Sequence, residues 1–212
     1  MKRGFKDSLV VILSANDAST MKNLLLNLDI PFDCVLVLDQ GSTDETANIC
    51  EEMGVGILQL GLPQGHMRCC RVGLDIANEK GKKFLYIVSG AVRFLTHVAH
   101  ELMLEMVRDQ NLAAVAPSQL IVDVSSNRTF FSSRTKWDLE APDWGHDFTV
   151  FNPAIDRIEA DFCHLSCALI RVDFLNEAGG IDDRFTSHLG DADIGYRLRM
   201  NGRSSAYLQQ SQ

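Results

Sequence analysis

The sequence predicts a three-layer α/β fold, in which helices cover both faces of a sheet. Short apolar runs rich in β-branched residues recur near positions 8–14, 34–39, 57–60 and 83–89. The first three runs are each followed by residues with helical spacing or by a helix-start pattern, as expected for buried parallel strands joined by helices. The 212 residues, 46% of them hydrophobic, can bury a sizeable core. We therefore predict a single domain over residues 1–212.

The first run, SLVVILSAND, is interpreted as a buried strand that ends near residues 14–16. Apolar residues at 24, 25 and 28 indicate that a helix follows it. Ser19 or Thr20 is expected to cap that helix, because a hydroxyl oxygen accepts a hydrogen bond from the exposed backbone N–H groups of a first turn.

The second strand, CVLVLD, ends at Asp39, and a turn and a capped helix start follow over residues 41–46. In open α/β sheets, ligands bind beyond the carboxyl ends of the strands. Asp39 is thus either a ligand contact or a solvated strand-end carboxylate, and the pattern leaves both interpretations open.

The third segment, ILQLGLPQGHMRCCRVGLDIAN, predicts a short strand, a loop and a helix with apolar residues at 67, 70, 74 and 77. Gly65 in the loop is a candidate phosphate contact. Arg71 is either a surface residue of the helix or a contact for a base edge or a diphosphate, both of which suit a guanidinium.

Near the end of the chain, a Gly-Gly turn at 179–180 precedes an amphipathic helix with Asp191 and Asp193 at its start. Residues 181–185 are expected to return to the core. Asp191 is either a helix cap or a carboxylate that faces a cleft, where the helix N-terminus keeps it ionised. The helix is expected to bury Ile194, Leu198 and the nearby Tyr207, and to hold Arg197, Arg199 and Arg203 near solvent.

These motifs resemble those of the inverting nucleotide-sugar glycosyltransferases of the GT-A fold, family 2, which includes rhamnosyltransferases and polysaccharide-synthesising enzymes. The string GGIDDRFTSHLGDADIGYRLRMNG is similar to the family pattern Gly-Gly-Phe-Asp-Glu-Arg-Phe, then Glu-Asp-x-Asp-Leu and a basic helix. The string VLVLDQGSTDET resembles Val-Val-Asp-Asn-x-Ser-x-Asp-x-Thr. The resemblance covers about residues 8–109 and 158–208. It implies a Rossmann-like α/β/α mixed sheet with a nucleotide-binding half, 1–110, and an acceptor half, 111–212.

The resemblance also implies the reaction: a sugar moves from a nucleoside-diphosphate donor to a hydroxyl of a saccharide, lipid-linked or protein acceptor, with inversion. Asp191 would be the general base, Asp39 would bind the nucleobase, and Asp44 would order its loop. The residues expected to contact the donor are Ser14, Ala15, Asn16, Asp39, Gly65, Arg71, Ser89, Gly90 and Ala91.

One departure from the family concerns a divalent cation, Mn²⁺ or Mg²⁺. The family holds it with Asp-x-Asp or Asn-Pro-Asp after the fourth strand, where this chain has Ser89, Gly90 and Ala91. Three interpretations remain open. The enzyme is metal-independent and uses an arginine on the diphosphate (Arg68, Arg71 or Arg93); or Asp191 or Asp193 holds the metal; or the chain is a catalytically inactive nucleotide-sugar-binding or scaffold protein.

Composition excludes other classes. The net charge of −8, without a basic stripe, argues against nucleic-acid binding. No apolar run is long enough to span a membrane, and the N-terminus does not resemble a signal peptide, so a cytoplasmic location is expected. The six cysteines are interpreted as reduced core residues. A zinc site at Cys163, His164 and Cys167 is disfavoured, since structural zinc needs four ligands.

Two further sets of side chains keep two interpretations each. His188 is either an acceptor or phosphate contact or a surface residue. Trp137 and Trp144 lie in the variable segment from 117 to 160. They either stack on an acceptor sugar or cover the core under a long loop.

Overall fold

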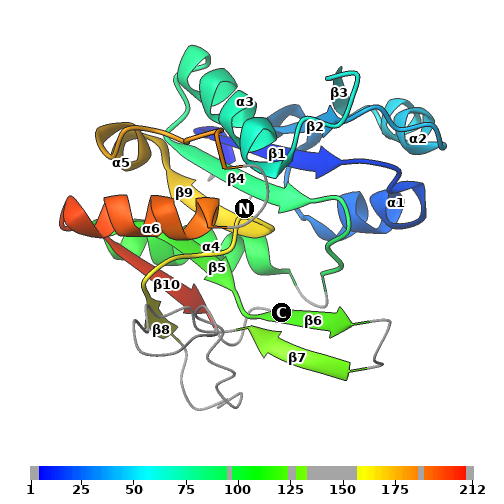
Figure 1. Ribbon diagram of the computed structural model, residues 1–212. Coiled ribbons are helices and arrows are strands. Elements are labelled where there is room, and N and C mark those ends of the chain that lie inside the picture. Colours follow the sequence, from blue (N-terminus) through cyan, green and yellow to red (C-terminus); the bar gives the residue numbers. More distant parts are fainter. Residues whose placement is uncertain (1–4, 95–96, 124–127, 133–156, 186–188, 209–212) are drawn as a thin grey trace.

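A mixed eight-stranded sheet runs through the middle of the molecule (Figure 1). The computed structural model describes residues 5–94, 97–123, 128–132, 157–185 and 189–208. The strand order is β3-β2-β1-β4-β9-β5-β10-β8, and β6 and β7 form a separate antiparallel pair. The strands are β1 (Ser8–Ser14), β2 (Val35–Asp39), β3 (Gly56–Gln59), β4 (Phe84–Ser89), β5 (Leu112–Pro117), β6 (Gln119–Asp123), β7 (Arg128–Ser132), β8 (Arg157–Ala160), β9 (Cys167–Arg171) and β10 (Ser204–Leu208).

Two strands give the sheet its mixed character. Strand β9 lies between β4 and β5 and runs antiparallel to both, and β8 runs antiparallel to β10 at one edge. The remaining neighbours pair in parallel. The mixed α/β/α sheet predicted from the sequence is therefore confirmed.

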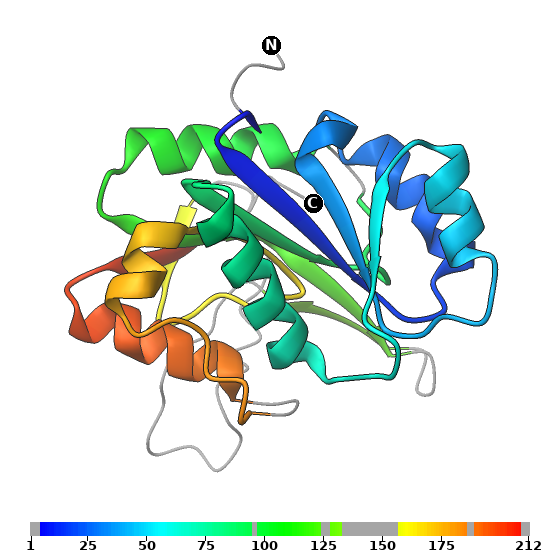
Figure 2. The ribbon, with the colours of Figure 1, turned by 90° about the horizontal axis from the view of Figure 1, so that it is seen from above.

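Helices cover both faces of the sheet, and Figure 2 shows the resulting three layers. One hydrophobic cluster joins the sheet to α1, α2 and α4, and a second joins the opposite face to α3, α5 and α6. Within the described ranges, no helix has both the length and the apolar character needed to cross a membrane. The helices are α1 (Ala18–Asn27), α2 (Thr46–Glu52), α3 (His66–Glu79), α4 (Val98–Arg108), α5 (Val172–Glu177) and α6 (Gly190–Met200), with a 3-10 turn at Phe32–Cys34.

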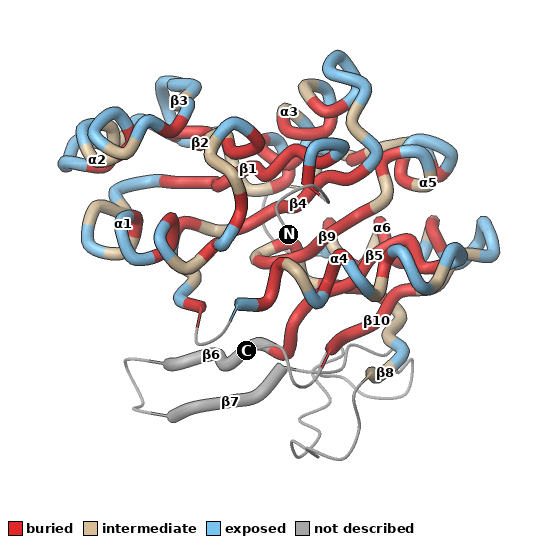
Figure 3. The backbone as a smooth tube through the Cα atoms, turned by 180° about the vertical axis from the view of Figure 1, so that it is seen from behind, coloured by how far each residue is buried: buried red, intermediate tan, exposed pale blue. Residues whose placement is uncertain are grey.

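Strand β1 shows why an uninterrupted apolar run suits the centre of this sheet. Val10 and Ile12 pack in the cluster on one face, and Leu9, Val11 and Leu13 pack in the cluster on the other. All are buried (Figure 3). Because successive strand side chains point to opposite faces, a strand covered on both sides needs apolar residues at every position.

The start of α1 differs from the sequence prediction. The helix begins at Ala18, so Ser19 and Thr20 lie in its first turn and neither caps it. The Thr20 hydroxyl donates instead to the carbonyl oxygens of Asp17, at 3.1 Å, and Gly90, at 2.7 Å. The turn after β1 is thus tied to the end of β4.

Candidate functional site

The carboxyl ends of three neighbouring parallel strands, β1, β2 and β4, lie side by side. We call this the strand-end edge of the sheet. In the register of the sheet, Ser14 of β1 lies opposite Asp39 of β2, and Leu13 of β1 lies opposite Ser89 of β4. The sequence-predicted donor contacts at these ends are therefore neighbours in space. Gly65 lies immediately before α3 with a φ of 88°, a left-handed conformation that glycine adopts without strain.

The Asp39 carboxylate is buried, with 2% of the residue exposed. Its Oδ2 accepts a hydrogen bond from the Ser42 backbone N–H at 3.2 Å, and its Oδ1 accepts one from the Ser42 hydroxyl. The same hydroxyl oxygen accepts from the Asn16 N–H at 2.8 Å, and Asn16 Oδ1 accepts from the Thr43 N–H at 2.8 Å. These contacts fix the loops after β1 and β2 against each other.

Asp44 fixes the same two loops from the other side. Its carboxylate accepts from the Ala18 N–H at 3.0 Å and from the Thr46 hydroxyl at 2.5 Å. The Thr46 hydroxyl, as the largest cause, lowers the pKa of Asp44 below its usual value. The geometry agrees with the loop-ordering role that the family resemblance implied.

Asp17, which sequence reasoning missed, occupies the place beside the substituted Ser89-Gly90-Ala91 motif. Its Oδ2 accepts from the Ser14 hydroxyl at 2.9 Å and from the Ala15 N–H at 3.0 Å. A Cβ atom added to Gly90 would lie 2.1 Å from the same oxygen, so a residue larger than glycine at position 90 would displace the Asp17 carboxylate. The sequence signal was the acidic residue directly after the first strand's Ser-Ala-Asn.

The end of β4 does not fit the cation site that the family resemblance implied. Mn²⁺ and Mg²⁺ need several oxygen ligands, and residues 89–91 supply no carboxylate. The nearby Asp17 carboxylate already accepts two hydrogen bonds through Oδ2. Across the described part of the chain, no group of three or more His, Cys, Asp or Glu side chains is placed to hold a metal ion.

Asp191 lies in the first turn of α6. The helix begins at Gly190, after Leu189 in a left-handed conformation, so Asp191 is not the capping residue. Its Oδ2 lies 3.2 Å from Nδ1 of His164 and accepts from the Leu165 N–H at 3.4 Å. The side chain is 24% exposed, so the carboxylate remains accessible from solvent.

The segment 164–166 connects Asp191 to the strand-end edge. While Leu165 donates to Asp191, the Ser166 carbonyl oxygen accepts from the Ser89 N–H at 2.7 Å. The His66 ring, at the start of α3, also interacts with the backbone of Leu165. Burial lowers the pKa of His66, although the Asp191 charge and the Leu165 contact oppose the shift. Segment 164–166 thus links Asp191, the predicted base, to Ser89 at the end of β4.

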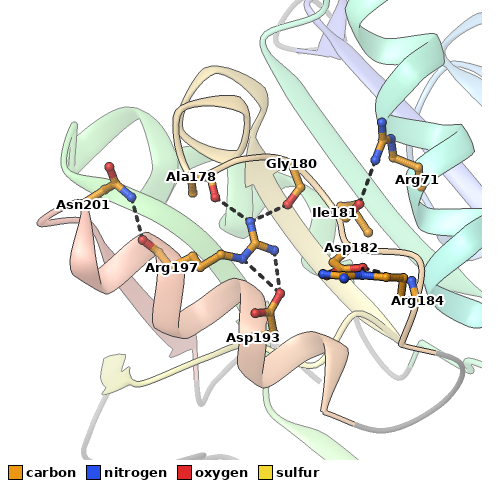
Figure 4. A network of polar contacts seen from close by, with 9 residues as sticks. All are labelled: Arg71, Ala178, Gly180, Ile181, Asp182, Arg184, Asp193, Arg197 and Asn201. Atoms are coloured by element: carbon orange, nitrogen blue, oxygen red, sulfur yellow. Dashed lines mark hydrogen bonds and ion pairs between the residues drawn. The ribbon is translucent and has the colours of Figure 1, made fainter.

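Asp193 has a different environment, shown in Figure 4. Its Oδ2 accepts from Nε and Nη2 of Arg197, at 3.0 and 2.7 Å. Nη1 of the same guanidinium donates to the carbonyl oxygens of Ala178, at 2.5 Å, and Gly180, at 2.7 Å. The pair therefore attaches the Gly-Gly turn to α6, and this leaves Asp193 poorly placed to share a metal with Asp191.

Two of the three arginines predicted to remain near solvent are half-buried instead. The Arg197 side chain is 24% exposed. Arg203 lies with its guanidinium carbon 3.6 Å from the centre of the Phe174 ring. The sequence pattern marked these positions as polar but did not show that their guanidinium groups would contact backbone carbonyls or an aromatic ring. Arg199 is exposed as predicted.

We expect Arg197→Ala to lower the free energy of unfolding by about 2–3 kcal/mol, because it removes a half-buried partner of Asp193 and two donors to carbonyls. Urea denaturation followed by circular dichroism measures this loss. Arg184→Ala is the matched control, since Arg184 pairs with Asp182 nearby on the exposed surface (Figure 4). An equal shift of the midpoint in both variants would contradict the expectation.

Arg71 lies on the exposed side of α3. Its Nε donates to Asp75 at 3.2 Å. Its Nη1 donates to the Ile181 carbonyl oxygen at 3.0 Å, as Figure 4 shows. These contacts hold the loop after the Gly-Gly turn against α3. Its contact with a donor remains a prediction.

All six cysteines are buried, which confirms that they are core residues, and the structure pairs none of them in a disulfide. Ile194, Leu198 and Tyr207 are buried as predicted. Of residues 181–185, Ile181 is buried, but 182–184 are not, so the predicted return to the core holds only in part. His188, Trp137 and Trp144 lie outside the described residues.

No protein-family model matches the sequence, and no curated protein matches it either. Solved structures do match over nearly all of this chain. The structure of GalNAc-T7 with UDP, GalNAc and Mn²⁺ aligns with a TM-score of 0.71 at 14% identity, covering 96% of this chain and 42% of that one.

Two further structures match similarly. The mannosyltransferase PcManGT from Pyrobaculum calidifontis, in complex with GDP-Man and Mn²⁺, aligns with a TM-score of 0.60 at 14% identity, over 94% of this chain and 53% of that one. S. aureus TarS 1-349 in complex with UDP aligns with a TM-score of 0.63 at 15% identity, over 96% and 58%. The chain thus spans about half the length of these proteins. It has the GT-A fold that they share.

Proposed function

We propose that this chain transfers a sugar from a nucleoside-diphosphate donor to an acceptor hydroxyl with inversion, and that Asp191 is the general base. The observation that carries the proposal is the connection through segment 164–166. It supports the proposal because it links an accessible carboxylate at the start of α6 to the end of β4, and ligands bind beyond the carboxyl ends of strands in open α/β sheets. The sugar transferases with this fold support the same reaction class by analogy.

In the proposed reaction, the acceptor oxygen attacks the anomeric carbon while its proton moves to the Asp191 carboxylate. A bond forms between the acceptor oxygen and the anomeric carbon, and the bond from that carbon to the diphosphate oxygen breaks with its electron pair. The nucleoside diphosphate leaves from the opposite side, so the anomeric centre inverts. The negative charge of Asp191 also favours an oxocarbenium-like transition state, by analogy with glycoside hydrolysis.

The donor is proposed to lie along the edge formed by the first strands, in the half 1–110. Asp39 would accept from the nucleobase, residues 14–16 would lie near the nucleoside, and residues 89–91 would lie under the ribose and diphosphate. Gly65 and Arg71 complete the proposed donor set. The acceptor would bind against the half 111–212.

The diphosphate needs positive partners, because the residues at the end of β4 do not fit a cation site. Arg68 on α3 and Arg93 after β4 are exposed, and we propose them for this role beside Arg71. Membership of family 2, a role in polysaccharide biosynthesis and a cytoplasmic location are part of the same proposal. The six buried cysteines, none of them in a disulfide, support that location.

A second candidate function is a nucleotide-sugar-binding or scaffold protein that has lost catalysis. The absence of a carboxylate at Ala91 favours it, since metal stabilisation of a departing phosphate is worth several kcal/mol in enzymes that use it. Asp17 beside Gly90 does not reverse this argument, because its Oδ2 is engaged with Ser14 and Ala15.

Calorimetric titration with UDP-, GDP- and dTDP-sugars, each with and without Mn²⁺, tests the donor site. We expect one donor to bind, and Asp39→Ala to weaken it by about tenfold to a hundredfold, because a buried hydrogen-bond partner of the base is lost. Ser42→Ala is the matched control, since it removes the hydroxyl that donates to Asp39 but leaves the Asp39 carboxylate in place.

The outcomes separate the two functions. Binding together with release of the nucleoside diphosphate in the presence of saccharide acceptors supports the transferase. Binding without release supports the scaffold. If no donor binds in any condition, both proposals are wrong.

A further inference from the structure

We infer that His164 is a positioning residue for Asp191: its ring N–H holds one oxygen of the carboxylate and leaves the other to take the acceptor's proton. This inference rests on the proposed function, since it assigns a role within the same site. It starts from the two contacts of the carboxylate. His164 Nδ1, at 3.2 Å, and the Leu165 N–H, at 3.4 Å, both meet Oδ2.

The chemistry of the pair assigns the proton on the ring. An ionised carboxylate only accepts hydrogen bonds, so the Nδ1 atom that meets Asp191 must carry hydrogen. Two donors then converge on Oδ2 from one side. Among the described residues no hydrogen bond to Oδ1 is found, and this atom remains available to the acceptor hydroxyl.

The position of His164 is itself fixed from two elements. Its backbone N–H donates to the hydroxyl oxygen of the buried Tyr207 in β10, at 2.9 Å. Its ring packs edge-on against Phe162, with ring centres 5.6 Å apart and an interplanar angle of 83°. A ring held in this way can determine the orientation of the carboxylate that it contacts.

The other titratable groups around Asp191 do not supply a competing charge near neutral pH. Burial raises the pKa of the Cys163 thiol to about 12 and that of Cys70 well above its usual value. Burial lowers the pKa of His66 on α3, which favours its neutral form. The hydroxyl oxygen of Tyr207 accepts a hydrogen bond from the backbone N–H of His164. The contact with His164 is therefore the side-chain interaction that orients Asp191.

In the reaction, this arrangement separates the two oxygens by function. Oδ2 remains bound to His164 and Leu165 throughout, and Oδ1 forms a new bond to the proton as the acceptor oxygen bonds to the anomeric carbon. Without His164, the carboxylate can rotate away from the acceptor. A misplacement of about 1 Å can slow an enzyme by about a hundredfold.

The kinetic test compares the His164→Ala and His164→Asn variants with the wild-type protein, using the UDP-, GDP- or dTDP-sugar that binds in the titration. We expect His164→Ala to lower kcat by roughly tenfold to a hundredfold with the donor KM unchanged. His164→Asn should restore most of kcat, because its amide can donate to Oδ2. His97→Ala, at an exposed histidine before α4, is the control with unchanged kcat.

A spectroscopic test is independent of turnover. In protein labelled with ¹⁵N-histidine at pH 8, the His164 signals, identified by their loss in His164→Asn, should show a protonated Nδ1. Asp191→Asn should shift the Nδ1 resonance, because the charged acceptor is removed.

The outcomes are distinct. Full kcat in His164→Ala, or an unprotonated Nδ1 in the wild-type protein, would overturn the inference. If the wild-type protein releases no nucleoside diphosphate, the proposed function fails, and the ¹⁵N spectra alone decide whether His164 holds Asp191. If His164→Ala does not fold, the kcat of His164→Asn relative to wild type tests the inference instead. A loss of kcat of more than about tenfold in folded His164→Asn would contradict the role of the N–H donor.

Discussion

Replacement of Asp191 by Asn is expected to lower kcat by about a thousandfold, because an amide cannot accept the acceptor's proton. Donor binding should stay within about twofold of wild type, since Asp191 lies across segment 164–166 from the proposed donor edge and acts only as the acceptor oxygen attacks. Steady-state release of the nucleoside diphosphate gives kcat, and calorimetry gives the donor affinity. The fold should persist, because Asn has nearly the same shape.

Asp193→Asn is the matched control on the same helix. Asp193 is as exposed as Asp191, 24% for each side chain, but its carboxylate is engaged by Arg197. We therefore expect Asp193→Asn to lower thermal stability and to keep kcat within a few-fold of wild type. A larger loss of kcat in Asp193→Asn than in Asp191→Asn would mean that the base is misassigned.

The fold was predictable because its signals are local. Continuous apolar runs predict β1 and β2, since a strand covered on both faces needs apolar residues throughout. Helical spacing predicts α3, and Met67, Cys70, Leu74 and Ala77 are all buried. The insertion of β9 between β4 and β5 is different. It depends on contacts between distant segments, and a short apolar run does not reveal which strands it will pair with.

In the candidate site, the sequence predicted only the positions that depend on a residue's own strand or helix. Asp39 at a strand end and Asp191 at a helix start follow from such positions. The contact of His164 with Asp191 spans 27 residues, and the approach of Asp17 to Gly90 depends on how two loops pack. An acidic residue after the first strand marks Asp17 as a candidate, but the sequence shows neither its approach to Gly90 nor the contact of His164 with Asp191, and both emerged only from the structure.

Gly195 is expected to be the glycine of α6 that tolerates substitution least. A Cβ atom added there would lie 2.3 Å from Cβ of Phe162 and 2.4 Å from the Asp161 carbonyl oxygen. Backbone cannot move aside as a flexible side chain does, so overpacking should cost about 3 kcal/mol. Alanine recovers about 1 kcal/mol of helix propensity, and we expect Gly195→Ala to lose about 2 kcal/mol in urea denaturation.

Gly190→Ala is the control that separates this steric effect from helix propensity, because it makes the same substitution in the same helix. A Cβ atom at position 190 would lie 2.5 Å from the Met67 sulfur, which belongs to a side chain and not to the backbone. That thioether can change rotamer, so a smaller loss is expected. Gly195→Ala should also lower kcat in the fraction that remains folded, since displacement of Phe162 moves the ring of His164 that packs against it. Equal stability of the two variants would show that the helix can shift away from residues 161–162. In that case the spacing between α6 and this segment does not determine where Asp191 lies.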